Sequence, residues 1–253
     1  EIIQLQERYV RKVIDTVNDL DNVLYEISNE SWGGSTAWQY HMINFVKDYE
    51  ALKPKQHPVG MTFQYKGGTN QILFDSPADW ISPNHLGGYR DNPPAADGSK
   101  VIITDTDHLW GIGGDQAWVW KSFMRGLNPL FMDPYNGNLI GEYFNPGRDP
   151  VRLSMGYART LSRQVDLNKM LPRGDLVSTA YCLADVGDTY LVYLPAGGSV
   201  QVDLRDLSGD ASVVWFNPNT NTSQNGAQVT GGASRTLTSP FGTQDAVLKI
   251  KKN

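Results

Sequence analysis

The sequence predicts an α/β protein in which repeated strand–helix units are followed by a small all-β sandwich domain. In the first two-thirds of the 253 residues, short apolar runs alternate with stretches long enough to be helices. Near residue 167 the rhythm changes to short alternating segments separated by Gly, Asp and Asn turns. We therefore divide the chain into a first domain over residues 1–167 and a second over residues 168–253.

The first domain is expected to open with a helix and to continue as strands that each lead into a loop or helix. Apolar residues recur at the helical period over residues 1–20. Strands are expected at residues 23–28, 58–65, 79–83, 100–108 and 130–135, and helices at residues 36–52, 115–126 and 149–165. Asp115 is a candidate N-cap, and Pro150 stands in the first helical turn, where proline is favoured. The Gly/Pro-rich passage over residues 66–99 is long for a loop, and loops of this length often carry function.

The second domain is expected to be an antiparallel sandwich. Alternating segments occur at residues 177–184, 189–194, 199–203, 211–217 and 246–251. Their spacing is typical of this class of fold. Residues 217–232 are polar and rich in turn-forming residues, which predicts a loop.

Composition excludes several classes of function. A net charge of -5 with scattered Lys and Arg argues against a nucleic-acid partner, which requires a clustered basic surface. No apolar run is long enough for a membrane span. Cys182 is the only cysteine, so it is expected in the core and not in a disulfide. The histidines are dispersed and no phosphate-binding or dinucleotide-binding loop is present, so we expect neither a metal nor a cofactor.

Candidate catalytic carboxylates stand at the ends of two expected strands. Asn29 and Glu30 end the first, and if that strand continues to Glu30, this side chain lies at its carboxyl-terminal lip. Asp105 and Asp107 share a parity at the end of residues 100–108. Two facing carboxyl groups suit glycoside hydrolysis, because one protonates the leaving oxygen while the other attacks or stabilises the anomeric carbon. The alternative is that Asp105 and Asp107 cap the following turn or bind a cation.

Candidate substrate-binding residues lie in the loops after the strands. Aromatic rings stack on sugar faces, and histidines or amides hydrogen-bond to hydroxyls. The candidates are Asn29, Trp32, Tyr65, His85, His108 and Trp110, with Trp80, Tyr135 and Tyr143 as further aromatic residues. Trp118 and Trp120 fall inside an expected helix and are assigned to the core.

The Asn29-Glu30 pair resembles that of the clan of retaining glycoside hydrolases built on (β/α)8, or TIM, barrels. In that clan, an Asn-Glu pair ends the fourth strand and supplies the acid/base, and a carboxylate that ends the seventh strand is the nucleophile. More narrowly, the chain is similar to bacterial glycoside hydrolases related to apiosidases, whose barrel is followed by a small β-sandwich named for collagen binding. Residues 190–194 (YLVYL) and 214–218 (VWFNP) carry the likeness to that sandwich.

The resemblance implies a partial TIM barrel that begins at strand four, followed by the sandwich. It assigns the acid/base to Glu30, sugar binding to Asn29 and the nucleophile to Asp107, with Asp105 as the alternative. The clan usually has glutamate at the nucleophile position. A preceding N-terminal segment or self-association is expected to complete the barrel, the substrate is expected to be a carbohydrate, and the location to be secreted or periplasmic. The alternatives are a carbohydrate-binding or attachment protein without catalysis, or an inactive fragment of such an enzyme.

Overall fold

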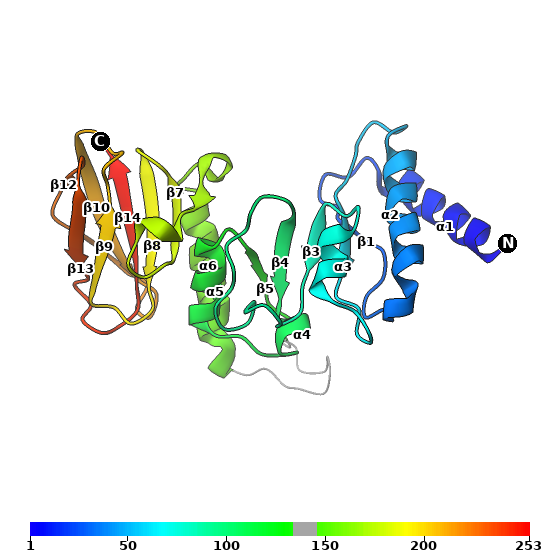
Figure 1. Ribbon diagram of the computed structural model, residues 1–253, viewed down its shortest axis with the longest axis horizontal. Helices are drawn as coiled ribbons and strands as arrows, with labels where there is room; N and C mark the ends of the chain where they lie inside the picture. The colour runs from blue at the N-terminus through cyan, green and yellow to red at the C-terminus, as the bar shows by residue number, and fades with distance from the viewer. Residues whose placement is uncertain (134–145) are drawn as a thin grey trace.

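The computed structural model describes residues 1–133 and 146–253 and is elongated. Figure 1 shows helices α1 and α2 at one end, a parallel sheet in the middle and antiparallel strands at the other end, with α5 and α6 between the two kinds of sheet. The N- and C-termini lie at opposite ends. Every helix in the described part of the chain is too short or too polar to span a lipid bilayer.

The first part of the chain forms a five-stranded parallel sheet whose strands follow one another in chain order, β1-β2-β3-β4-β5. The strands are β1 Tyr25–Glu26, β2 Val59–Thr62, β3 Trp80–Ser82, β4 Val101–Asp105 and β5 Asn128–Leu130. The helices are α1 Ile2–Val17, α2 Thr36–Glu50, α3 Asn70–Asp75, α4 Thr106–Leu109, α5 Gln116–Met124 and α6 Asp149–Ser162. The expected alternation of strands and helices is confirmed.

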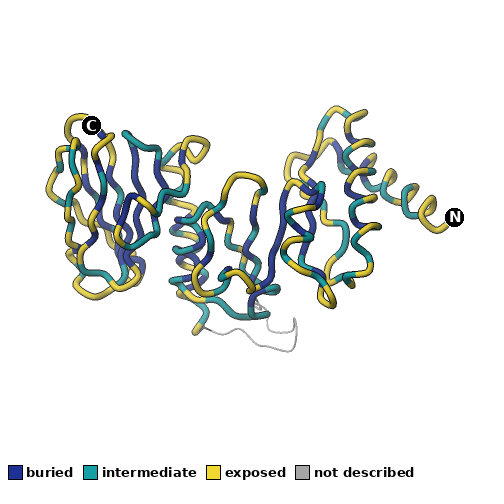
Figure 2. Tube along the Cα trace, in the orientation of Figure 1, coloured by how far each residue is buried: buried dark blue, intermediate teal, exposed yellow. Residues whose placement is uncertain are grey.

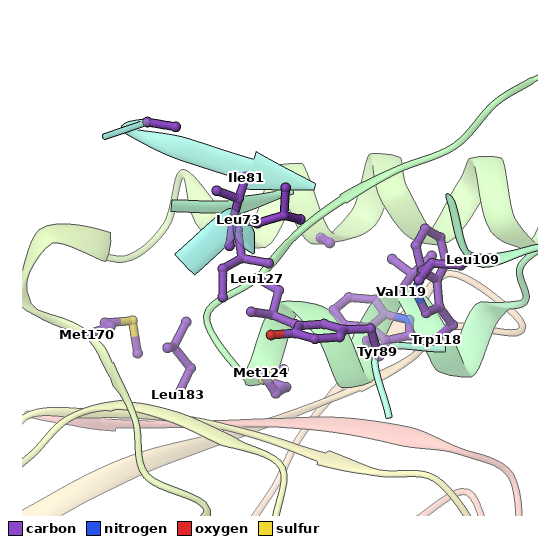
Figure 3. Packing of buried hydrophobic residues seen from close by; sticks show 14 of the residues in the cluster. Leu73, Ile81, Tyr89, Leu109, Trp118, Val119, Met124, Leu127, Met170 and Leu183 are labelled. Carbon is purple, nitrogen blue, oxygen red and sulfur yellow. The ribbon is translucent and has the colours of Figure 1, made fainter. Parts of the chain in front are cut away.

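The register of these strands separates an apolar face from a more polar face. Val59, Met61 and Ile81 alternate with residues of the other face and lie, fully buried, in one core with side chains of the helices. Figure 3 shows Ile81 close to Leu73 of α3 in this core. The opposite face carries Trp80 over Gly60, and Thr62 and Ser82 are neighbours at its carboxyl-terminal end.

Several expected strands are shorter in the structure because side chains end them. The segment expected over residues 23–28 pairs only at Tyr25–Glu26, and Asn29 and Glu30 form a turn. The strand expected over residues 100–108 ends at Asp105, whose carboxylate accepts the backbone N–H of Asp107 at 3.0 Å and caps α4. The prediction that Glu30 and Asp107 lie on strand faces was therefore wrong, whereas the capping alternative for Asp105 is confirmed.

Other differences concern the long loop and the last parallel strand. Residues 66–99 contain α3, which Thr69 caps by accepting the N–H of Ile72 at 3.3 Å. The strand expected at residues 79–83 is present as β3, so Trp80, a candidate for contact with a ligand, lies in a strand and is only 7% exposed. Strand β5 ends at Leu130, since the backbone N–H of Met132 turns to the Thr106 hydroxyl at 2.9 Å. Tyr135 and Tyr143 lie outside the described residues.

The C-terminal part consists of antiparallel strands in two sheets. The larger has the order β11-β10-β14-β8-β7-β6, with β12 also paired to β10, and the smaller pairs β13 with β9. The strands are β6 Leu171–Pro172, β7 Cys182–Asp185, β8 Thr189–Leu194, β9 Ser199–Asp203, β10 Asp210–Asn217, β11 Thr222–Asn225, β12 Val229–Thr230, β13 Ser234–Thr238 and β14 Ala246–Lys252. Strands β11 and β12 lie within the expected loop over residues 217–232, so that prediction was wrong.

Strand β8 is buried on both faces, as the dark blue strands of Figure 2 illustrate. Tyr190, Val192 and Leu194 contribute to the core between the two antiparallel sheets. Leu191 and Tyr193 face the other way and join the core of the parallel sheet and its helices. The Tyr193 ring stacks on Trp120 of α5 with centroids 6.3 Å apart. The two parts of the chain therefore share one apolar interface.

A buried polar cluster closes the end of the structure near α1. The carboxylate of Glu50 accepts the backbone N–H of His57 at 2.6 Å and lies 2.8 Å from Nδ1 of the same residue. Asn18 and Tyr25 donate to the same carboxylate at 3.0 and 3.1 Å. Burial alone raises the pKa of Glu50, but these hydrogen bonds outweigh it and lower the pKa. The His57 pKa is raised, chiefly by its hydrogen bond to Glu50.

Candidate active site

The predicted site residues follow the carboxyl ends of neighbouring parallel strands. Asn29 and Glu30 follow β1, Tyr65 follows β2, His85 follows β3, and the segment from Asp105 to Trp110 follows β4. Because the strands are parallel, these loops lie at the same edge of the sheet, where Figure 1 shows α4. The fold therefore gathers the segments that carry the candidates.

The loop after β1 is fixed to the loop after β2. The backbone N–H of Gly33 donates to the carbonyl of Lys66 at 2.6 Å, and Trp32 forms a parallel bridge with Lys66. A Cβ at position 33 would come within 2.6 Å of the Gly67 backbone, so only glycine fits this close approach. The side chain of Trp32 is 68% exposed, which leaves it accessible to a ligand.

Glu30 occupies an unusual backbone conformation in this loop. Its φ of 48° lies in the left-handed region, which is uncommon for residues other than glycine. The residue is exposed, and its carboxylate accepts no hydrogen bond from the described residues. The hydroxyls of Ser28 and Ser31, on either side of Asn29 and Glu30, are hydrogen-bonded to each other. The turn therefore presents the Asn29 and Glu30 side chains to solvent.

A second glutamate, Glu26, lies in β1 itself. Glu26 accepts a hydrogen bond from the Thr62 hydroxyl at 2.8 Å. The same hydroxyl is 3.3 Å from the carbonyl oxygen of Ser28. Glu26 therefore belongs to the polar face of the sheet and has a partner on β2.

Helix α4 carries two further candidates, His108 and Asp107, whose side chains have different hydrogen-bonding environments. The hydroxyl of Ser82, at the end of β3, is 2.8 Å from Nδ1 of His108. Nε2 of His108 is buried and has no hydrogen-bond partner among the described residues. The Asp107 carboxylate accepts no hydrogen bond from the described residues. The end of β4 thus holds an oriented histidine and a carboxylate free to act on a ligand.

Asp105 has a different electrostatic environment. Burial raises its pKa, against the opposing effects of the Asp107 backbone N–H and of His108. Because its carboxylate accepts the Asp107 backbone N–H, the geometry of Asp105 suits a capping role better than attack.

The remaining candidates lie around this edge with different exposure. Tyr65 is 67% exposed, with Lys66 Nζ 5.7 Å from its ring centroid. His85 is exposed in the loop after β3. Trp110 is partly buried and packs edge-on against Trp118, with centroids 5.6 Å apart. Tyr65 and His85 are therefore accessible, whereas Trp110 has a packing role in addition.

The structure adds an ion pair after β5 that the sequence analysis did not select. Arg152 of α6 donates to both carboxylate oxygens of Asp133, at 2.6 and 2.9 Å. Arg152 also donates to Asp149 at 2.8 Å. The signal in the sequence was an acidic residue after a strand, the same criterion that selected Asp107. No group of three or more His, Cys, Asp or Glu side chains that could hold a metal ion occurs among residues 1–133 and 146–253.

Comparison with known proteins places the fold in a class. The structure superposes on a solved glycoside hydrolase with a TM-score of 0.68 and 13% identity, covering 98% of this chain and 68% of that one. A glycoside hydrolase family 5 structure from Bacteroides vulgatus ATCC 8482 gives a TM-score of 0.70 and 13% identity, covering 97% of this chain and 66% of that one. The chain therefore has an α/β fold like that of glycoside hydrolases, and it spans about two-thirds of their length.

The C-terminal part has a separate match. Residues 169–251 match the sequence model of a family described as "Putative collagen-binding domain of a collagenase". None of the curated proteins matches the sequence. The chain thus resembles known proteins in two ways. Nearly its whole length has a hydrolase-like fold, and its C-terminal end matches the sequence of a named domain.

Proposed function

We propose that the protein is a glycoside hydrolase that cleaves O-glycosidic bonds of an oligosaccharide or polysaccharide with two carboxylates, by a retaining mechanism. The observation that carries this proposal is the gathering of Asn29-Glu30 and Asp105 to His108 at one edge of a parallel sheet with a hydrolase-like fold. Active sites of parallel α/β folds lie at the carboxyl ends of the strands. Glycoside hydrolysis needs two carboxyl groups that flank the scissile bond.

The roles follow from the environment of each group. Glu30 is the acid/base, and Asn29 binds the sugar hydroxyl beside the reacting carbon. Asp107 is the nucleophile, because its carboxylate is free whereas that of Asp105 is occupied as a helix cap. Trp32, Tyr65, His85, His108 and Trp110 contact the sugar.

The parallel sheet is proposed to be part of a TIM barrel over residues 1–167, with residues 168–253 as a β-sandwich domain. Strands β1 and β5 each have one unpaired edge in the described structure. Beside β1, a cavity of about 360 Å³ is lined by α1, α2 and β1, including Val10, Val13 and Ile27. The apolar Leu5 of α1 is 53% exposed. An N-terminal segment or a second copy that pairs with these edges would cover this surface.

Substitution of the two carboxylates in the full-length protein tests the proposal. Glu30→Gln should lose activity on an alkyl glycoside but should still release a burst of 2,4-dinitrophenolate from a 2,4-dinitrophenyl glycoside, whose leaving group needs no proton, before slow deglycosylation limits turnover. Asp107→Asn should lose activity on both substrates. Azide should restore turnover by Glu30→Gln, and the product should be a glycosyl azide of retained configuration. Asp105→Asn serves as the comparison. Full activity of Glu30→Gln on the alkyl glycoside would refute the role of Glu30, and loss in Asp105→Asn alone would move the nucleophile to Asp105.

A second candidate function is glycan binding or attachment without catalysis. The observation that favours it is the exposure of Glu30 together with the domain match over residues 169–251. Binding of a glycan by the wild-type protein without any turnover would select this candidate. We propose export from the cell for either function, since polymeric glycans lie outside it.

A further inference from the structure

The C-terminal strands contain a groove away from the candidate active site. It has a volume of about 350 Å³ and lies between β10, β11 and β13. Its floor is apolar, and Val213, Trp215 and Leu237 contribute to it. Pockets for small ligands begin at roughly 300 Å³, so the groove is large enough for a ligand.

The rim of the groove offers hydrogen-bonding groups that the protein itself does not use. Gln224 pairs with Trp215 and lies on the same face of the sheet as its ring; it is exposed, and its side chain has no hydrogen-bond partner among the described residues. The indole N–H of Trp215 is likewise without an acceptor among the described residues. An amide and an indole N–H beside an apolar floor match the alternation of hydroxyls and C–H faces on a sugar.

Glycine at position 226 keeps the floor accessible. A Cβ there would lie 3.1 Å from Nε1 of Trp215 and 2.7 Å from Cγ1 of Val213. Any side chain at this position would therefore cover the indole N–H and part of the apolar floor. The backbone N–H of Gly226 donates to the Val213 carbonyl at 2.9 Å, which holds the strand in this position.

The charge and the strand edges limit the class of ligand. None of the residues that line the groove is ionisable, so it lacks the groups that recruit an acidic or basic partner. An extended polypeptide would add to a long, free strand edge. Here β11 has only four residues and ends at Asn225, and Pro240 follows β13, so neither edge is a good template.

From this combination we propose that the groove between β10, β11 and β13 is a binding site for a neutral glycan chain. The site is separate from the carboxylates at the edge of the parallel sheet. It would hold the protein on an uncharged polysaccharide, whether or not the proposed hydrolysis takes place.

Affinity electrophoresis of the full chain in gels that contain xyloglucan, galactomannan or, as the acidic comparison, polygalacturonate tests this site. A neutral polysaccharide should retard the wild-type protein. Gln224→Ala, which loses the hydrogen-bonding side chain beside Trp215, should bind roughly tenfold more weakly. Gly226→Ala should also lose binding, because its methyl group covers the indole N–H of Trp215 and part of the apolar floor. Ser223→Ala, on the same strand but outside the groove, should bind as the wild type does.

Two further measurements separate this site from the proposed catalytic one. Glu30→Gln/Asp107→Asn should be retarded like the wild type, whatever happens to turnover. Retention of binding by the groove variants, binding of polygalacturonate alone, or no binding to any of the polysaccharides would overturn the proposal. Binding of a triple-helical collagen peptide that is lost in the groove variants would also overturn it, in favour of a polypeptide ligand.

Discussion

Gln116, in the first turn of α5, donates a hydrogen bond to the carboxylate of Asp245 at 2.8 Å and thereby joins the helix to the loop before β14. The same carboxylate accepts from the buried Tyr193 hydroxyl at 2.9 Å and from Asn219 at 2.5 Å. It thus satisfies donors from both parts of the chain. Helix α5 follows the loop that begins at Trp110, directly after α4, so this contact also anchors the end of that loop.

Asp245→Ala should destabilise the protein, because it leaves the Tyr193 hydroxyl unpaired in the interior. We expect a cost of about 1–3 kcal/mol in the free energy of unfolding. For a chain of this size, each kcal/mol lowers Tm by about 2–4 °C, which calorimetry resolves. Asp206→Ala removes the same charge from an exposed residue and should leave Tm nearly unchanged. Equal Tm values for the two variants would contradict the role of Asp245.

Gly60→Ala should also destabilise the protein, for a steric reason. A Cβ at position 60 would lie 1.9 Å from Cε2 of Trp80 on the neighbouring strand. Overpacking of this kind costs about 1–3 kcal/mol. Gly156→Ala is the matched comparison, since the site lies on an exposed part of α6 with no atom within 4 Å of the new Cβ. It should stabilise the helix by about 0.5–1 kcal/mol, and urea unfolding measures both changes.

Gly60 and Trp80 also allow a test of this steric explanation. If the Trp80 ring is the obstacle, Trp80→Leu should reduce the additional cost of Gly60→Ala in a double-mutant cycle. Additive free energies would mean that the alanine is opposed by something other than Trp80.

The His57–Glu50 cluster should make stability depend on pH. Since the pKa of His57 is raised, its contribution is complete below the unfolded-state value of about 6.5 and is lost as the pH rises through the folded-state pKa. The lowered pKa of Glu50 adds stability above its unfolded-state value of about 4.3 that is lost on acidification. The destabilisation caused by His57→Gln should therefore be larger at roughly pH 6 than at roughly pH 9. Urea unfolding of both proteins at the two pH values measures this difference, and the opposite order would be inconsistent with the cluster.

Cys182 should resist thiol reagents in the native protein. Burial raises its pKa to about 12, and the side chain is fully buried in β7. The thiolate is the reactive form, so both effects slow modification. Reaction with Ellman's reagent should be negligible under native conditions and should reach one thiol per chain in denaturant, and rapid modification of the native protein would refute its placement.

The sequence predicted those features that depend on patterns within a segment. Trp118 and Trp120 were assigned to the core of a helix capped by Asp115, and the structure agrees, with the carboxylate accepting the Trp118 N–H at 2.7 Å. Asp107 was misplaced because a run of apolar residues does not reveal where a side chain will cap the backbone. Asp105 ended the strand two residues before the predicted site.

Partners distant in the chain explain the other differences. Nothing near Tyr193 in the sequence indicates that Trp120 will cover it. The sequence therefore could not show that one of the two faces of β8 packs into the core formed by the parallel sheet and its helices. The segment of β11 was predicted as a loop because its residues are polar and turn-forming, yet it pairs with β10 through backbone atoms that any residue supplies. The Glu26–Thr62 contact likewise depends on which strands become neighbours.

The double burial of β8 limits how this architecture can be shuffled by recombination. A breakpoint near residue 168 would transfer the strands without the helices and convert the patch around Leu191 and Tyr193 from interior to surface. Exposed apolar patches promote aggregation. A chimera that carries α5 and α6 together with the strands would keep the patch covered, so a transferable module of this structure includes the helix layer.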